Sequence, residues 1–192
     1  GTEIFMDMFD EPEYVSDLIA YCADFIIAEA KLYVEAGMDV IAVVDPLVSQ
    51  ISSDHFEEFL SAPYTKIFDE IRKMGVYSSF FVCGDATRNI ECMCKTKPDS
   101  ISVDENIRIA DIRPITEKYD VAVGGNIPLT TVMLHGSQQD NMKYVVELID
   151  SVKDSNHNFI VSPGCDMPYD VPVENTIGAA QAVLEYEKVK EL

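Results

Sequence analysis

Residues 40–45 read VIAVVD, and this stretch decides how the rest of the sequence is interpreted. Five apolar residues in a row, ended by an acidic one, are typical of a strand buried on both faces, as the strands of parallel sheets are. A helical pattern follows over residues 54–74 and ends at Gly75, and residues 77–84 (YSSFFVCG) return to a strand. The stretch therefore predicts a βαβ unit in a parallel sheet.

The same alternation of strand and helix runs through the whole sequence. Strands are expected at residues 100–104, 121–125 and 159–164, with helices at residues 11–36, 88–95, 107–118, 139–152 and 172–190. Five such strands form either an open doubly wound sheet or an arc of a barrel. No strand is followed by the GxGxxG pattern of dinucleotide-binding folds, which leaves the Rossmann interpretation with little support. We expect an α/β fold in a single domain, residues 1–192.

The composition narrows the class of partner. The chain has 192 residues, of which 47% are hydrophobic and 25% charged, and its net charge is −20. Such an excess of acid repels phosphate backbones and anionic lipid, so we expect neither nucleic acid nor a membrane as a partner. No apolar run approaches the ~18 residues of a membrane-spanning helix. The five cysteines lack the spacing of a disulfide framework and indicate reduced thiols in a cytoplasmic protein.

Polar residues gather where the predicted strands end. Asp45 follows the first strand and Asp104 closes the third. In parallel α/β folds the loops at these ends converge on one mouth, where sites form. A carboxylate there can ligate a metal or act as acid and base, so Asp45 and Asp104 are the candidate catalytic residues. The structural alternative is that Asp45 only precedes a proline turn and that Asp104 caps the next helix.

Two cysteines, Cys83 and Cys165, end two different predicted strands, and each stands beside a glycine. Two thiolates at one mouth, helped by a carboxylate or a histidine, can hold zinc tetrahedrally and leave one position open. The alternative is that both are free cysteines packed in the core. We expect Asp45, Cys83, Asp104 and Cys165 to converge on one mouth. His157 precedes the last strand, so we expect it to lie far away, on the opposite side of the sheet.

Two motifs carry a resemblance to a known family. Residues 125–128 (GNIP) contain a GN-P turn, and residues 163–175 read PGCDMPYDVPVEN. With the order of the strand segments, they resemble the uroporphyrinogen decarboxylase superfamily over essentially the whole chain, and most closely its corrinoid-dependent methyltransferase branch. The resemblance implies a (β/α)8 TIM barrel, here incomplete, of which the chain covers about the last five βα units. It also implies that Gly125 and Asn126 bind substrate.

The methyltransferase branch implies methyl transfer from a methyl-corrinoid, carried by a partner protein, to a thiol-type acceptor activated by zinc. In that branch zinc is held by a His-x-Cys pair and a distant cysteine, and these positions correspond here to Phe81, Cys83 and Cys165. Phenylalanine cannot ligate a metal. The resemblance therefore predicts a weakened zinc site, completed by a carboxylate such as Asp45 or Asp104, or the loss of the metal.

Two alternatives stay open. A uroporphyrinogen decarboxylase would act on a tetrapyrrole in porphyrin biosynthesis and needs no metal. A truncated, non-catalytic barrel would need a partner chain. In each case an arc of five parallel strands leaves two edges with unpaired backbone groups. We therefore expect a homo-oligomer or a partner chain that completes the barrel.

Overall fold

The computed structural model describes residues 3–154 and 158–190, and the strands within them form one parallel sheet in the order β1-β2-β3-β4-β5. These strands are β1 (Val40–Val44), β2 (Tyr77–Val82), β3 (Ser100–Val103), β4 (Ala122–Ile127) and β5 (Phe159–Pro163). The spatial order follows the sequence, as it does in an arc of a (β/α)8 barrel. The predicted α/β fold and all five predicted strands are confirmed. The prediction for His157 falls outside the described residues.

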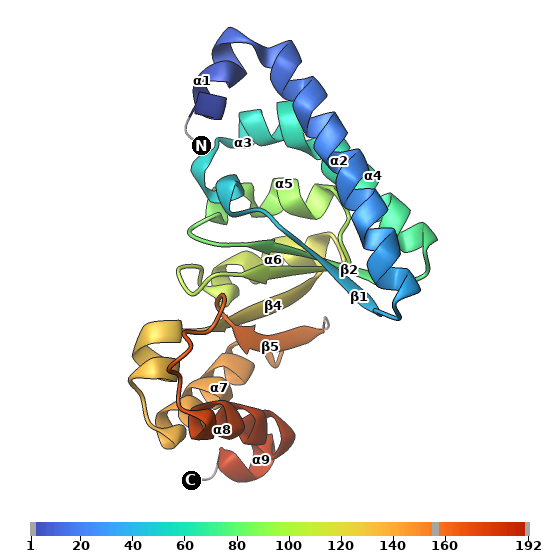
Figure 1. Cartoon of the computed structure of the whole chain (residues 1–192). Coiled ribbons are helices and arrows are strands. Elements are labelled where there is room, and N and C mark those ends of the chain that lie inside the picture. Colours follow the sequence, from blue (N-terminus) through green and yellow to red (C-terminus); the bar gives the residue numbers. More distant parts are fainter. Residues whose placement is uncertain (1–2, 155–157, 191–192) are drawn as a thin grey trace.

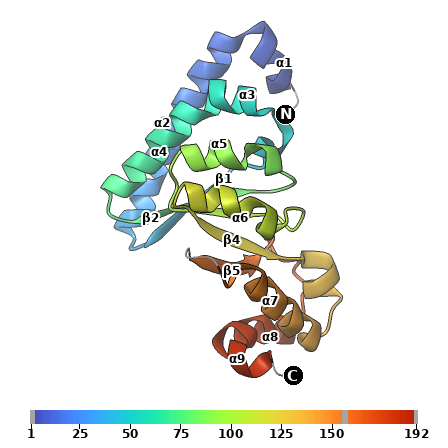
Figure 2. The ribbon, with the colours of Figure 1, turned by 180° about the vertical axis from the view of Figure 1, so that it is seen from behind.

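The helices that connect the strands lie on one side of the sheet (Figures 1 and 2). The longer helices are α2 (Pro12–Glu35), α4 (Ser61–Lys73), α6 (Ile109–Lys118), α7 (Gln138–Val152) and α8 (Val173–Leu184). The shorter elements are α1 (Glu3–Asp10), η1 (Pro46–Gln50), α3 (Ser53–His55), η2 (Phe56–Leu60), η3 (Thr87–Asn89), α5 (Ile90–Lys95), η4 (Leu129–Leu134) and α9 (Tyr186–Val189). Across residues 3–154 and 158–190, none of the helices has the length and apolar character needed to cross a membrane.

The helix-covered side of the sheet carries the core. Val43, Phe80 and Ile101 stand side by side on neighbouring strands, and all three are buried. The ring of Phe80 lies 4.3 Å from that of Tyr64 and 5.3 Å from that of Phe68, measured between centroids, so α4 packs directly onto β2. Large apolar side chains at alternate strand positions are what the continuous apolar runs of the sequence predict for this side.

The opposite side of the sheet is built differently. One position further along each strand, the residues face this opposite side. They are Val44, Phe81, Ser102, Gly124 and Ile160, which stand next to one another on successive strands. A Cβ on Gly124 would lie 2.6 Å from Ser102 Oγ, so any larger residue there would displace the serine hydroxyl. The two end members are open, with Val44 55% and Ile160 49% exposed. In a closed (β/α)8 barrel this is the inner side, which side chains from all eight strands fill in layers.

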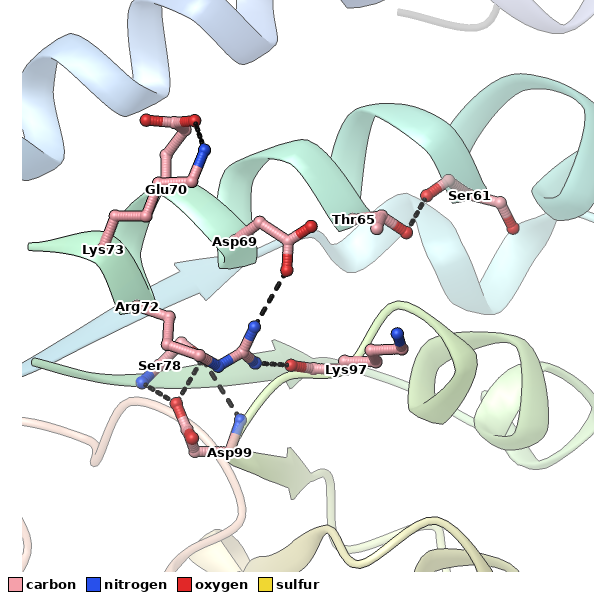
Figure 3. Close-up of polar contacts among 9 residues, drawn as sticks. All are labelled: Ser61, Thr65, Asp69, Glu70, Arg72, Lys73, Ser78, Lys97 and Asp99. Atoms are coloured by element: carbon pink, nitrogen blue, oxygen red, sulfur yellow. Dashed lines mark hydrogen bonds and ion pairs between the residues drawn. The ribbon is translucent and has the colours of Figure 1, made fainter. Parts of the chain in front are cut away.

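The amino-terminal edge of the sheet is held by polar contacts (Figure 3). Asp99 Oδ2 accepts hydrogen bonds from the backbone N–H of Ser78 at 2.7 Å and from its hydroxyl at 2.8 Å. Arg72, at the end of α4, pairs with Asp69 at 2.9 Å and donates to the carbonyl oxygen of Lys97. These contacts tie α4 and the start of β3 to β2, which fixes the position of the strands at the edge opposite the mouth.

The sheet does not close on itself. Helices α1 and α2 lie at one end of the structure and α8 and α9 at the other (Figure 1). Strands β1 and β5 are the first and last of the sheet, so each has one edge with no strand of the described chain beside it. The arc is therefore open at both ends.

Candidate functional site

The thiols of Cys83 and Cys165 meet at the carboxyl ends of the strands. Cys83 follows β2 and Cys165 follows β5, and β3 and β4 stand between these strands. Their sulfur atoms nevertheless lie 3.2 Å apart. That is within the ~4.5 Å that two thiolates on one zinc ion can span, given a Zn–S distance of about 2.3 Å. The structure thus meets the geometric condition, and the role of the two cysteines as ligands stays a prediction.

The surroundings keep the Cys83 thiol protonated. Loss of contact with water, the hydrogen bond to Cys165 and the negative charges of Asp104 and Asp166 raise the pKa of Cys83 to about 12. At neutral pH the thiol is therefore the dominant form, because each of these influences disfavours the anion. A nearby positive charge would act in the opposite direction and favour the thiolate.

The described residues do not supply a complete zinc site. Within residues 3–154 and 158–190, no group of three or more histidine, cysteine, aspartate or glutamate side chains is placed to hold a metal ion. Phe81 lies two residues before Cys83 on the strand, is half-buried, and offers no donor atom. Catalytic zinc generally takes three protein ligands and a water molecule. The thiol pair provides two ligands, one fewer than such a site needs.

Asp45 is held on the side of α4. Its Oδ2 accepts a hydrogen bond from the Tyr64 hydroxyl at 2.6 Å, and its Oδ1 accepts one from the backbone N–H of Leu47 at 2.9 Å. Burial and then the charge of Asp45 raise the pKa of Tyr64. The carboxylate thus caps η1 and satisfies a buried phenol, while its catalytic role stays a prediction. The sequence analysis missed Tyr64; its only signal was that a buried tyrosine hydroxyl needs a partner.

Asp104 lies near enough to Cys83 for its charge to act on that thiol. It is half-exposed, and its Oδ1 accepts a hydrogen bond from the backbone N–H of Asn106 at 2.9 Å. Asp166, next to Cys165, acts on Cys83 in the same sense. The structure thus brings Cys83 and Cys165 into contact, and the charges of Asp104 and of Asp166, which the sequence analysis did not single out, act on Cys83 without completing a metal site within the described residues.

Gly125 and Asn126 shape the neighbouring loop. The Asn126 side chain is 4% exposed, and its Nδ2 donates to the carbonyl oxygens of Asp104 at 2.9 Å and Ile107 at 2.6 Å. A Cβ on Gly125 would lie 2.8 Å from the carbonyl oxygen of Val103, and its φ is +132°. Close packing and a positive φ therefore explain the glycine at position 125, and the two hydrogen bonds to the loop explain the asparagine at position 126. Their role in substrate binding stays a prediction.

Asn126 shares its arrangement with two other buried asparagines, Asn89 and Asn175, each of which holds the loop of the neighbouring unit. Each amide group donates to two backbone carbonyls of the loop in the preceding βα unit. The bonds run from Asn89 to Val48 and Ile51, from Asn126 to Asp104 and Ile107, and from Asn175 to Met133 and Gly136. A buried carbonyl without a partner is costly, so these side chains stabilise the loops on which the candidate site stands.

The fold defines a class of protein, the (β/α)8-type barrels, in which sites lie at the carboxyl ends of the strands, the edge where the thiol pair stands. The sequence model of the uroporphyrinogen decarboxylase (URO-D) family matches residues 1–186. The chain belongs to this family.

Named relatives include two kinds of enzyme. The Methylcobamide:CoM methyltransferase MtbA of Methanosarcina acetivorans is 30% identical over 190 residues, which cover 97% of this chain and 54% of that protein. A uroporphyrinogen decarboxylase of Trichodesmium erythraeum is 28% identical over 169 residues, covering 87% of this chain and 46% of that protein. The chain spans about half the length of the curated relatives it matches.

A solved structure confirms the fold. A methyltransferase from Methanosarcina mazei superposes with a TM-score of 0.85 and 22% sequence identity, covering 96% of this chain and 53% of that one. The arc described here therefore corresponds to a segment of a larger fold of this type.

Proposed function

We propose that this chain is part of an enzyme that transfers a methyl group from a methyl-corrinoid, carried by a partner protein, to a thiol-type acceptor. The observation that carries the proposal is the extent of the similarity to MtbA, 30% identity over 97% of the chain. The decarboxylase of Trichodesmium erythraeum reaches 28% over 87%. The thiol pair at the mouth supports the same function, because cysteine donors are a means of holding a metal beside an acceptor.

In this proposal the mouth described here is one wall of the active site. Cys83 and Cys165 line it, and Asp104 and Asp166 make it acidic. A thiol acceptor reacts as its thiolate, and the acidic wall disfavours that form. The positive charge that activates the acceptor is therefore contributed by a cofactor or by residues that complete the barrel. Zinc bound through the thiol pair would supply such charge, and the missing third donor makes its binding weak.

The proposed enzyme needs more strands than the described chain contains. A closed barrel of this type has eight strands, so three further βα units would pair with β5 on one side and with β1 on the other. The side of β1 offers a groove of about 470 Å³ lined by Ile26, Tyr33, Met38 and Val44 among others. We propose that a partner chain with apolar strands fills it. A second copy would bring the total to ten strands and fits closure less well.

The test is a methyl-transfer assay on the completed barrel. The chain is mixed with a methylated corrinoid protein and a thiol acceptor, with and without a polypeptide that supplies the remaining βα units. We expect the absorbance of the methyl-corrinoid to decay only when both polypeptides are present. A completed barrel that folds and leaves the methyl-corrinoid unchanged would contradict the proposal.

One observation favours decarboxylation as a second candidate. The described residues lack a third metal donor, and a uroporphyrinogen decarboxylase needs no metal. The completed barrel is therefore also incubated with uroporphyrinogen, and the carboxyl groups of the products are counted by chromatography. Loss of carboxyl groups without methyl transfer would establish this alternative. A completed barrel inactive in both assays would indicate a non-catalytic protein.

A further inference from the structure

We propose that Cys83 and Cys165 form a reversible disulfide, which makes the mouth of the arc a site of thiol–disulfide exchange. The sulfur atoms lie 3.2 Å apart, although the two residues are 82 positions apart in the sequence. A disulfide bond is about 2.05 Å long. Two thiolates at tetrahedral positions on one zinc ion would lie about 3.8 Å apart. The observed separation falls between these distances, so the two sulfurs would have to approach by only about 1 Å to form the bond.

The pair is also accessible and without a competing ligand set. Both side chains are half-buried, so a small reagent can reach the sulfurs. In the part of the chain that the structure describes, no third donor joins them to complete a metal site. The other cysteines stand elsewhere, with Cys22 exposed on α2 and Cys92 and Cys94 buried on α5. Pairing of Cys83 with Cys165 is therefore the reaction that the fold prepares.

The exchange balances with a low-molecular-weight disulfide such as oxidised glutathione. One protein sulfur attacks a sulfur of the reagent, which forms a mixed disulfide and releases the first glutathione thiol. The other protein sulfur then attacks the protein sulfur of the mixed disulfide and releases the second glutathione thiol. The two cysteines lose two electrons and two protons, and the reagent gains them as two thiols. The second step is intramolecular and is favoured by the 3.2 Å separation.

The bond would join the carboxyl end of β2 to the loop after β5, across β3 and β4. Such a long closed loop restricts the unfolded chain, so we expect the melting temperature to rise by roughly 5–15 °C on oxidation. The oxidised pair would also withhold both sulfurs from a metal or an acceptor. The inference goes beyond the proposed methyl transfer and does not depend on it, because the bond forms in the chain alone.

The experiment compares the reduced chain with the chain equilibrated in oxidised glutathione. Free thiols are then blocked, and the protein is digested and analysed by mass spectrometry without reduction. We expect a linked peptide pair that contains Cys83 and Cys165, together with a higher melting temperature that dithiothreitol reverses. Cys83→Ser and Cys165→Ser should each lose both effects. The matched control Cys22→Ser should keep them.

Three outcomes would overturn the inference. The first is that both thiols are alkylated separately after oxidation and the melting temperature is unchanged. The second is that oxidation stops at mixed disulfides with glutathione. The third is that purified protein carries one zinc ion per chain, which protects both thiols from the reagent. If a serine variant fails to fold, as judged by circular dichroism, the comparison of reduced and oxidised wild-type chain decides alone.

Discussion

The two faces of the sheet differ in how far the described chain covers them. On the helix-covered face, Val43 is 6% exposed and Phe80 and Ile101 are fully buried. On the opposite face, the adjacent row has serine and glycine at its centre and exposed Val44 and Ile160 at its ends. The first face is a finished core within the described chain. The second is the inner wall of a barrel that needs additional strands to be covered. Stability therefore comes from one face, and the candidate chemistry lies at the edge of the other.

The strongest test of this contrast is Phe80→Ala. Phe80 is fully buried and contacts the rings of Tyr64 and Phe68. Its truncation leaves a cavity under α4, so we expect the free energy of unfolding to fall by about 3–5 kcal/mol. Urea denaturation followed by circular dichroism measures the loss. The matched control is Phe81→Ala, the neighbouring phenylalanine on the other face, where we expect about 1 kcal/mol or less because the side chain is only half-buried. Equal losses would contradict the contrast.

The strands and helices that form the helix-covered face are also the part of the structure that the sequence could predict. The alternation of strand segments with helical patterns located all five strands. The expectation that VIAVVD is buried on both faces was wrong: Ile41 and Val43 are buried, whereas Val40 and Val44 are exposed on the face that the described chain leaves open. Helix α1 was missed because its eight residues make only about two turns, fewer than the roughly 11 to 18 residues over which a helical period can be recognised. The predicted last helix is interrupted at Glu185, between α8 and α9.

The site was predicted only in part. The carboxyl ends of the strands are recognisable from sequence, and so Cys83, Asp104 and Cys165 could be named. That Cys83 reaches Cys165 across β3 and β4 depends on the curvature of the sheet, which no local pattern encodes. The hydrogen bond between the Tyr64 hydroxyl and Asp45 joins residues from two different elements. The periodicity of the sequence places Tyr64 on a helix face and Asp45 at a strand end, and it does not show that the two side chains meet.

The second prediction concerns the loops at the mouth. Asn126→Ala removes two donated hydrogen bonds and leaves the carbonyl oxygens of Asp104 and Ile107 without these donors. We expect a loss of about 1–3 kcal/mol in the free energy of unfolding, measured by urea denaturation. Asn106→Ala, on the exposed part of the same loop, is the control and should change it by no more than about 0.5 kcal/mol. If the two variants are equally stable, Asn126 does not hold the loop.

The third prediction turns to the metal. We expect substoichiometric zinc in the purified, reduced wild-type chain, because the described residues offer the thiol pair no third donor. Phe81→His places an imidazole two residues before Cys83 on the same side of the strand, and zinc content should rise toward one ion per chain. Atomic absorption after dialysis measures this. The double variant Phe81→His with Cys165→Ser should lose the gain. No change in zinc content on Phe81→His alone would count against a metal site at this position.

The smallest effect on folding is expected at the open edge. Val44→Lys changes a side chain that is already 55% exposed, so we expect the isolated chain to lose about 0.5 kcal/mol or less in urea denaturation. Val43→Lys, one position away on the covered face and 6% exposed, is the contrasting control and should cost several times more, because it buries an ammonium group without a partner.

Val44→Lys has a larger effect on assembly than on folding if another chain covers the inner face of the sheet in solution. Unpaired strands with apolar side chains favour association, and a lysine on an edge strand opposes it. We therefore expect light scattering to give the wild-type chain a mass above 21.4 kDa when no completing partner is present, and Val44→Lys to shift it toward that value. With a partner chain, the variant should weaken binding and leave the fold of the arc intact. A wild-type chain that is a stable, well-folded monomer of 21.4 kDa would instead show that the arc tolerates its open edges, and the proposal of a completing partner would then lose its physical basis.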